Sequence, residues 1–313
     1  MAKKNKKKEQ PVIINSAGEE VKYHKKKRTG KERLSANLFL TPSFIGVMIF
    51  FILPSFVVLY YANIDGIIAQ NFVGLKNFKD VVSNSAFQSA AKNTAFFSLI
   101  SVPLAIILSL LMAILLEHEI PGRGFFRTFF LSPLMVPVAS IVLIWRVLFD
   151  NHGAINDAIA FIGGNPVDWM KSDYSMLVIV ILFLWKNLGY NMILFMAALN
   201  AVPKEVLEVS VLDGAGAWKQ FWKIKFRYLT PTIFFVGIMS LINSFKVFRE
   251  VYLLTGDYPF KSLYMLQHYM NNTFKSLDYQ KLSAAAIIMC GVMIIIVGLL
   301  FVFENKADKD MEG

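Results

Sequence analysis

Long apolar runs separated by short polar connections make up most of the chain beyond residue 37. A helix needs roughly 20 apolar residues to cross about 30 Å of hydrocarbon. Six runs meet this length, and they predict membrane-spanning helices at 38–61, 94–116, 126–149, 175–198, 230–251 and 282–303. The first run is longer than the apolar region of a secretory signal and five more follow it, so we expect it to be retained. The pattern predicts an all-α, polytopic membrane protein with about six transmembrane helices.

Composition agrees with this fold class. The chain has 313 residues, of which 56% are hydrophobic and 17% are charged, whereas soluble domains are about half apolar and a quarter charged. The single cysteine, Cys290, lies in the last apolar run, so no disulfide can form within the chain. We expect Cys290 to be a small packed side chain.

The formal charge of +10 is concentrated at the N-terminus. Residues 1–36 hold twelve Lys and Arg against four Glu, which leaves +2 for the rest of the chain. Nucleic-acid platforms interleave aromatic and basic side chains, but Tyr23 is the only aromatic residue in this segment. The pattern favours a disordered basic tail that contacts anionic membrane lipid, and no nucleic-acid partner is expected.

The distribution of Lys and Arg over the connections orients the spans. Seven basic residues in the second and fourth connections fall on the side of the tail: Arg123, Arg127, Lys204, Lys219, Lys223, Lys225 and Arg227. The three opposite connections carry lysines only, and no basic tail adds to them. Both termini are therefore predicted to be cytoplasmic. The expected organisation is a basic cytoplasmic tail over 1–36, a six-helix transmembrane domain over 37–304 with a cytoplasmic loop at 199–229, and a short cytoplasmic tail over 305–313.

Motifs for catalysis or nucleotide binding are absent from the sequence, which contains no HExxH, GxSxG or GxxxxGK[ST]. No catalytic residue, metal site or cofactor bound by this chain is expected. Five charged residues lie in or near the predicted spans: Arg146, Lys186, Lys246, Arg249 and Glu250. Apart from Lys246, we expect them close enough to span ends to snorkel or pair at the interface. Without a carboxylate in mid-span, ion-coupled transport lacks its usual group, so energy for transport would come from another source.

The fourth connection carries an unusually charged segment, "EVLEVSVLDGAGAWKQFWKIKF", at 205–226. Pro203 suits the first turn of a helix, and Glu205 and Glu208 lie near its positive end. The glycines of "DGAG" at 213–216 then interrupt the helix. The segment predicts two short helices joined at a glycine corner.

The second of these helices is amphipathic. Trp218, Phe221 and Trp222 share one face at helical spacing. Tryptophan and lysine suit a helix that lies on lipid, and they equally suit a helix that enters a groove of a soluble partner. The residues alone leave both interpretations open.

The same segment resembles the cytoplasmic signature of ABC-importer permeases: Glu-Ala-Ala, two residues, Asp-Gly-Ala, five residues, Phe, two residues, Ile, one residue, Leu-Pro. Six residues stand at matching places: Glu208, Asp213, Gly214, Ala215, Phe221 and Ile224. Similarity to the sugar-importing subfamily extends over nearly all of 36–303, through stretches such as "FFRTFFLSPLMVP" at 125–137, "IWRVLFD" with "GAIN" at 144–156, and "LWKNLGYN" at 184–191. The chain departs from the signature where Val209 and Ser210 replace the alanines and Phe226 and Arg227 replace Leu-Pro. Arg227 could continue the helix, with its end delayed to Pro231.

The resemblance implies the type I ABC importer permease architecture in a bacterial cell membrane, and ATP-driven import of a sugar, with an oligosaccharide as the expected form. The implied partners are a second homologous permease, a dimer of cytoplasmic ATPase subunits that bind ATP and Mg²⁺, and an external solute-binding protein. Residues 205–227 would couple to the ATPase. Asp213 and Gly214 would set the corner, while Glu208 would hold the loop or pair with the partner. The candidate coupling residues are Glu205, Glu208, Asp213, Gly214, Ala215, Trp218, Phe221 and Ile224.

The resemblance also implies a substrate path between the two permeases, along the fourth and fifth spans. The candidates are Trp185, Leu188, Gly189, Asn191, Met192, Ser240, Asn243 and Ser244. Small and polar residues in membrane helices often serve only helix packing, which is the alternative for each of them. Two other functions stay open: import of another neutral or phosphorylated polyol, and a non-transporting membrane scaffold whose cytoplasmic hairpin recruits a regulator.

Overall fold

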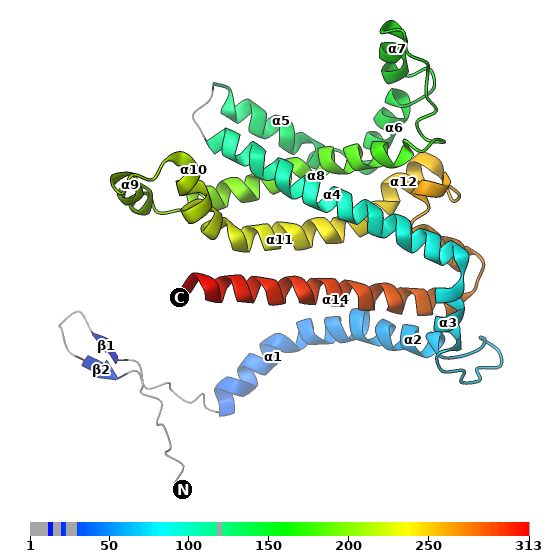
Figure 1. The fold of residues 1–313 in the computed structure, drawn as a ribbon. Helices are drawn as coiled ribbons and strands as arrows, with labels where there is room; N and C mark the ends of the chain where they lie inside the picture. The colour runs from blue at the N-terminus through cyan, green and yellow to red at the C-terminus, as the bar shows by residue number, and fades with distance from the viewer. Residues whose placement is uncertain (1–11, 15–19, 23–29, 118–120, 313) are drawn as a thin grey trace. The chain divides into compact units, whose positions relative to one another are not determined.

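The computed structural model describes residues 12–14, 20–22, 30–117 and 121–312, and it contains two compact units, 1–57 and 58–313. In the first unit, β1 (Val12–Ile14) pairs antiparallel with β2 (Glu20–Lys22), so the basic tail holds a short strand ladder where the sequence predicts disorder. Then come α1 (Gly30–Val47), a π-helical turn (Met48–Ile52) and α2 (Leu53–Ala62), whose second half belongs to the second unit (Figure 1). The π-helical turn directly precedes Pro54, whose ring would otherwise clash with the preceding turn of an α-helix.

The second unit is helical in all the longer segments that the structure describes, as the sequence predicts. Its α-helices are α3 (Lys76–Ser83), α4 (Ser85–Glu117), α5 (Arg123–Met135), α6 (Val138–Leu148), α7 (Ala154–Phe161), α8 (Ser175–Asn200), α9 (Lys204–Leu212), α10 (Ala217–Gln220), α11 (Phe226–Phe245), α12 (Phe248–Thr255), α13 (Leu266–Lys275) and α14 (Tyr279–Glu312). A π-helical turn (Phe221–Lys225) joins α10 to α11, and a 3-10 turn (Lys261–Leu263) precedes α13. Because α14 continues through Glu312, the described part of the predicted 305–313 tail extends the last helix.

Within the described residues, five helical segments are long and apolar enough to cross a membrane: 37–62, 85–117, 175–200, 217–255 and 279–306. They confirm five of the six predicted spans, with shifted ends. The sixth predicted span, at 126–149, is broken: α5 and α6 meet at an angle of 103° and count as one span only when taken together. The break lies at Val136 and Pro137, both of which have extended backbone angles. A residue before proline is disfavoured in the helical region, and proline removes a helix donor.

The core of the second unit forms where α4 packs along α8, with α5 and α11 against them. Phe97 of α4 meets Phe183 of α8 edge to face at a ring distance of 5.5 Å. Ser98 of α4 and Ser244 of α11 share a hydrogen bond of 2.8 Å. Small side chains and interhelical hydrogen bonds of this kind hold membrane helices together, because lipid provides no hydrophobic drive between them.

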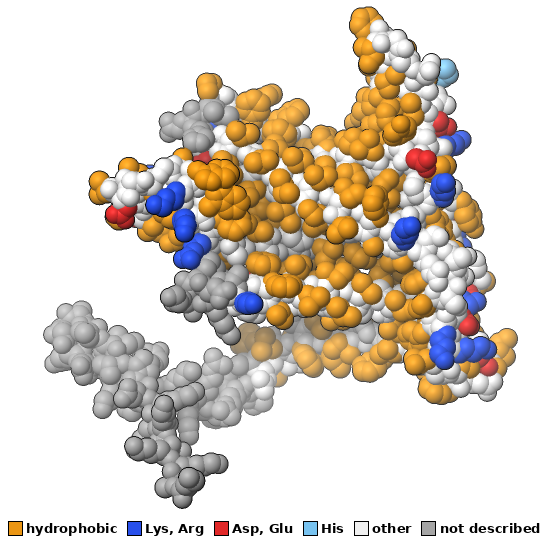
Figure 2. Space-filling model, in the orientation of Figure 1, with side chains coloured by type: hydrophobic (Ala, Val, Ile, Leu, Met, Phe, Trp, Pro, Cys, Tyr) orange, Lys and Arg blue, Asp and Glu red, His pale blue; other side chains and the backbone are white. Residues whose placement is uncertain are grey.

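Charged side chains gather toward the two ends of this unit, and apolar side chains cover the band between them (Figure 2). The segment α9–α10 lies at one end of the α4–α8–α11 group, and α12 and α13 lie at the other (Figure 1). The start of α5 and the end of α14 lie at the same end as α9–α10. This arrangement is that of a multi-pass membrane protein, with the second and fourth connections on one side.

Candidate functional site

The helix–corner–helix segment predicted at 205–226 is present. Pro203 precedes the first turn of α9 with an extended backbone, and Glu205 lies in that turn, where the helix dipole favours a negative charge. Glu205 and Glu208 are both exposed. The first helix of the segment therefore presents its two carboxylates to the outside of the unit.

The corner is a glycine-dependent helix end. Gly214 has a left-handed backbone with φ of 74°. The N–H of Gly214 donates to the carbonyl of Val211 at 3.0 Å, and the N–H of Ala215 donates to the carbonyl of Ser210 at 2.9 Å. This pair of bonds is the Schellman motif, which closes a helix with a residue in the left-handed region. Asp213 is the last residue before the turn, and it is exposed.

A polar clamp that the sequence did not reveal closes the corner. The Gln220 amide nitrogen donates to the Ser210 hydroxyl at 2.9 Å and to the Leu207 carbonyl at 3.3 Å, while the Ser210 hydroxyl donates to that carbonyl at 2.7 Å. Ser210 is the residue that replaces the second alanine of the family signature. The departure from that signature thus ties α9 to α10.

Both helical parts of this segment carry exposed apolar groups. Trp218 is 76% exposed and Trp222 is 48% exposed, with their rings 5.7 Å apart, whereas Phe221 packs against the cluster formed by α8 and α11. On α9, Leu212 is 87% exposed. Ala215 and Ile224 are half-buried. A partner or lipid must cover this surface, because a large exposed apolar patch marks an interaction site.

The segment is rigidly joined to the spans. α10, the π-helical turn and α11 form one helical run from Ala217 to Phe245. The Lys225 ammonium lies 2.6 Å from the carboxylate of Glu117 at the end of α4. Arg227 continues the helix as expected, but the expected end at Pro231 is wrong, because α11 contains Pro231 and runs on. Proline disfavours the continuation of a helix, but here the packing of α11 on α4 and α8 outweighs that preference.

Most of the predicted substrate-path residues lie between helices of this chain. The Asn191 amide donates to the Ser240 hydroxyl at 3.1 Å, and both residues are buried, as is Met192. Ser244 is buried against α4, and Gly189 packs on the backbone of α5. Trp185, Leu188 and Asn243 are at least partly exposed. The substrate role of all eight residues stays a prediction.

A cavity of about 280 Å³ does lie between α8, α11 and α12. Among its lining residues are Lys186, Asn187, Tyr190, Asn243, Lys246, Arg249 and Glu250. The Asn243 amide donates to the Asn187 side-chain oxygen at 3.0 Å. Of the predicted path residues, Asn243 is the one in this lining.

Lys186 and Glu250 are placed differently from the expectation that they reach a span end. Lys186 lies near the middle of α8 and forms an ion pair with Glu250, which is 4% exposed. A buried carboxylate needs such a partner, since an unpaired one would carry a large desolvation cost. The charges alone predict that such residues form pairs, but which residue pairs with which depends on how α8 and α12 meet.

An apolar multi-pass bundle with an exposed helix–corner–helix segment at one end and a polar cavity toward the other defines a membrane transport subunit. Residues 105–307 match the family model described as binding-protein-dependent transport system inner membrane component, and the chain belongs to this family. The family resemblance drawn from the signature is thereby confirmed, as is a multi-pass location in the bacterial inner membrane. The family description also supports an external binding protein as a partner.

Curated relatives of similar length match most of the chain. The sn-glycerol-3-phosphate transport system permease protein UgpA of Agrobacterium fabrum is 30% identical over 277 residues, which cover 86% of this chain and 94% of the relative. The trehalose/maltose transport system permease protein MalF of Thermococcus litoralis is 31% identical over 71% of this chain and 77% of its own length. The multiple sugar-binding transport system permease protein MsmF of Streptococcus mutans is 29% identical over 88% and 95%, respectively.

A solved structure has the same fold. A chain of a bacterial ABC transporter involved in the import of the acidic polysaccharide alginate superposes with a TM-score of 0.77, at 20% identity, over 88% of this chain and 96% of that chain. The architecture expected from the signature, that of a type I ABC importer permease, is confirmed.

Proposed function

We propose that this chain forms half of the translocation path of an ATP-driven saccharide importer and couples to a cytoplasmic ATPase through residues 205–227. The names of the relatives support a sugar or a phosphorylated polyol as substrate, since they name trehalose and maltose, multiple sugars and glycerol 3-phosphate. A second homologous permease would supply the other half of the path. The ATPase dimer would bind ATP and Mg²⁺, and both termini of this chain would be cytoplasmic.

The observation that carries this proposal is the exposed corner at Gly214 within a segment that is continuous with α11. A compact pair of helices with exposed apolar and acidic groups suits the groove of a soluble partner. When ATP binding closes the ATPase subunits, the docked corner moves with them. Because α10 and α11 are one helical run, this movement passes to Asn243 at the cavity.

The test is to copurify this chain with its neighbouring permease, the candidate ATPase and the binding protein, and to measure ATP hydrolysis stimulated by the loaded binding protein. Gly214→Val should abolish the stimulation, because a β-branched residue is strongly disfavoured at φ of 74°. Gly214→Asn should retain much of it, since asparagine tolerates the left-handed region. Gly216→Ala is the matched control: Gly216 has φ of −69° and no atom within 4 Å of an added β-carbon.

Retained stimulation in Gly214→Val would contradict the coupling role of the corner. Failure of the folded chain to assemble with any ATPase would remove the energy source, and it would leave the membrane scaffold as the better account.

A further inference from the structure

Three cavities follow one another along α12, away from the coupling segment. The first is the 280 Å³ cavity beside Glu250, and it shares Lys246 and Arg249 with a neighbouring cavity of about 400 Å³. That cavity shares Tyr252 and Leu253 with a third, of about 440 Å³. Each cavity shares wall residues with the next, so the three are neighbours in a row toward the end of the unit where α12 lies (Figure 1).

The row carries a strong excess of positive charge. Five basic residues line it, namely Arg146, Lys171, Lys186, Lys246 and Arg249. Among the described residues, Glu250 is the one acidic residue in these linings, and Lys186 is the one cation of the five with an ion-pair partner. Nearby Asp257 already binds the Lys275 ammonium at 2.5 Å. Lys186, Lys246 and Arg249 lie within helical segments that could span the membrane, where charged groups are costly and usually functional.

The same walls offer groups that suit a sugar ring. Tyr252, Tyr258 and Phe260 present aromatic surface. Asn187 and Asn243, which hydrogen-bond to each other, bring amide groups to the lining. The second carboxylate oxygen of Glu250 is buried and has no hydrogen-bond partner within the described part of the chain. A hydroxyl group donating to that oxygen would satisfy it, because a buried acceptor without a partner costs free energy.

From this row we infer an anionic sugar or polyol as the substrate: one that carries carboxylate or phosphate groups. Lys246 and Arg249, which line two of the three cavities, pair with the anionic group. The aromatic and amide side chains contact the ring and its hydroxyls. This inference rests on the proposed function and names the substrate class of the same path.

The experiment uses the full complex with its binding protein, in lipid nanodiscs for ATP hydrolysis and in proteoliposomes for uptake. Three probes are compared in both measurements: a trisaccharide of uronic acids, a neutral trisaccharide of the same size, and glycerol 3-phosphate. We expect one of the two anionic probes, and not the neutral trisaccharide, to stimulate. Glycerol 3-phosphate and the uronate separate a phosphate from a carboxylate.

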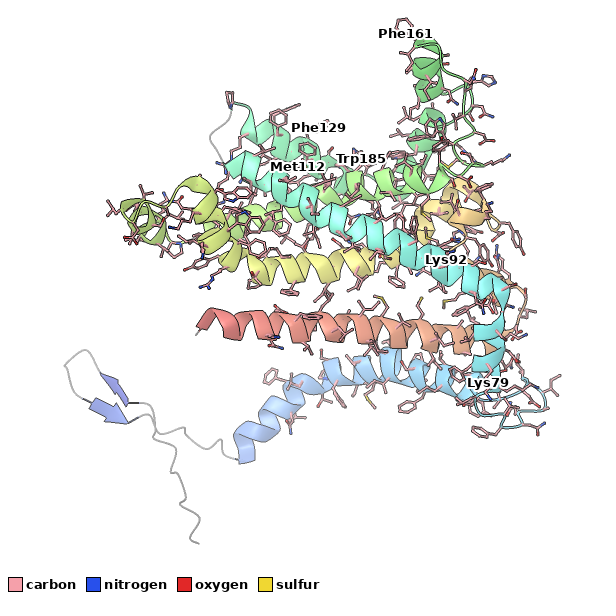
Figure 3. All side chains as sticks on the ribbon, viewed as in Figure 1. Lys79, Lys92, Met112, Phe129, Phe161 and Trp185 are labelled. Atoms are coloured by element: carbon pink, nitrogen blue, oxygen red, sulfur yellow. The ribbon has the colours of Figure 1, made fainter. Side chains whose placement is uncertain are left out.

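Variants then assign the recognition to the row. Lys246→Gln and Arg249→Gln should each lower kcat/KM for the anionic probe about tenfold, as the loss of a charge-assisted contact would. Lys246→Arg keeps the charge and should restore most of the activity. Lys92→Gln removes an exposed lysine of α4 that lies outside all three linings, and it should change nothing (Figure 3).

Stimulation by the neutral trisaccharide alone, or by no anionic probe while basal ATP hydrolysis persists, would overturn the inference and leave the importer intact. Unchanged kinetics in both Gln variants would also overturn it. Loss of the second permease from either Gln variant would assign the cations to a subunit interface instead. A complex without ATP hydrolysis would reject the proposed function itself.

Discussion

Replacing Gly189 with alanine tests whether this residue serves helix packing, the alternative to its predicted place in the substrate path. A β-carbon at Gly189 of α8 would lie 1.8 Å from the backbone oxygen and 2.4 Å from the carbonyl carbon of Phe130 in α5. Ordinary contact begins at about 3.4 Å, so the two helices must separate by roughly 1.6 Å. No side-chain rotation can relieve this overlap, because the obstructing atoms are backbone.

The expected cost follows from this geometry. Overpacking a well-packed interior costs about 1–3 kcal/mol, and separating two helices along their contact places Gly189→Ala near the upper end. The matched control is Gly237→Ala in α11, where the added β-carbon would lie 3.6 Å from the Ile106 side chain, at ordinary contact distance. Both changes gain up to about 1 kcal/mol of helix propensity. Their difference therefore isolates the overlap with α5.

The assay is thermal unfolding of the purified chain in detergent, followed by loss of the monodisperse peak in size-exclusion chromatography. A cost of about 3 kcal/mol should lower the midpoint by roughly 5–10 °C, whereas Gly237→Ala should keep or raise it. Equal midpoints for the two variants would refute a tight contact between α5 and α8. Gly189 would then be free to serve the substrate path.

Three further predictions concern other polar groups. Burial lowers the pKa of His268 to about 4, below its ordinary value of 6.5, and Asp257 opposes the shift. The folded state therefore favours the neutral imidazole. The free energy of unfolding should have its full value above pH 6.5 and fall by up to about 3 kcal/mol as the pH drops toward 4. His268→Gln should lose this slope in thermal unfolding, and a persisting slope would assign it to other groups. Asn156→Leu should cost about 2–3 kcal/mol locally, because its buried amide donates to three carbonyls and accepts from a backbone and an indole N–H. Limited proteolysis between α6 and α8 should accelerate in that variant and stay unchanged in the neighbouring Asn151→Leu. For the Glu117–Lys225 pair, a double-mutant cycle with Gln at each position should give a coupling energy of at most about 1 kcal/mol, since both groups are partly exposed. A larger coupling energy would contradict a partly solvated pair.

Features set by local sequence were predictable. Apolar runs mark five of the spans because length and composition decide whether a helix can cross a bilayer. The corner at 213–216 was predictable because a left-handed helix end needs glycine, and Gly214 supplies it. Periodicity does not indicate a partner for residues 205–227. The resemblance to the family does, because it implies an ATPase.

Features that depend on how distant segments meet were not predictable. The 103° angle between α5 and α6 depends on what each half packs against, which Pro133 and Pro137 alone do not reveal. The clamp from Gln220 to Ser210 joins residues on two helices across the corner, and a change from alanine to serine at one position does not reveal its partner. The same holds for the pairing of Lys186 with Glu250 across α8 and α12.

The polar residues of α8, α11 and α12, together with Lys246 between the last two helices, divide into two groups by the partners that they bind. Asn191 and Ser240 bind each other and are buried, so in this conformation they hold the helices together. Lys246 and Arg249 are exposed and line cavities. An uncharged polar group can find its hydrogen-bond partner on a neighbouring helix, whereas an unpaired cation needs water or an anion. Under the proposed function, charge rather than polarity identifies the surface open to a substrate. The helical run from Ala217 to Phe245 lies between that surface and the corner at Gly214, so we expect variants at its two ends to change the choice of substrate and the response to ATP separately.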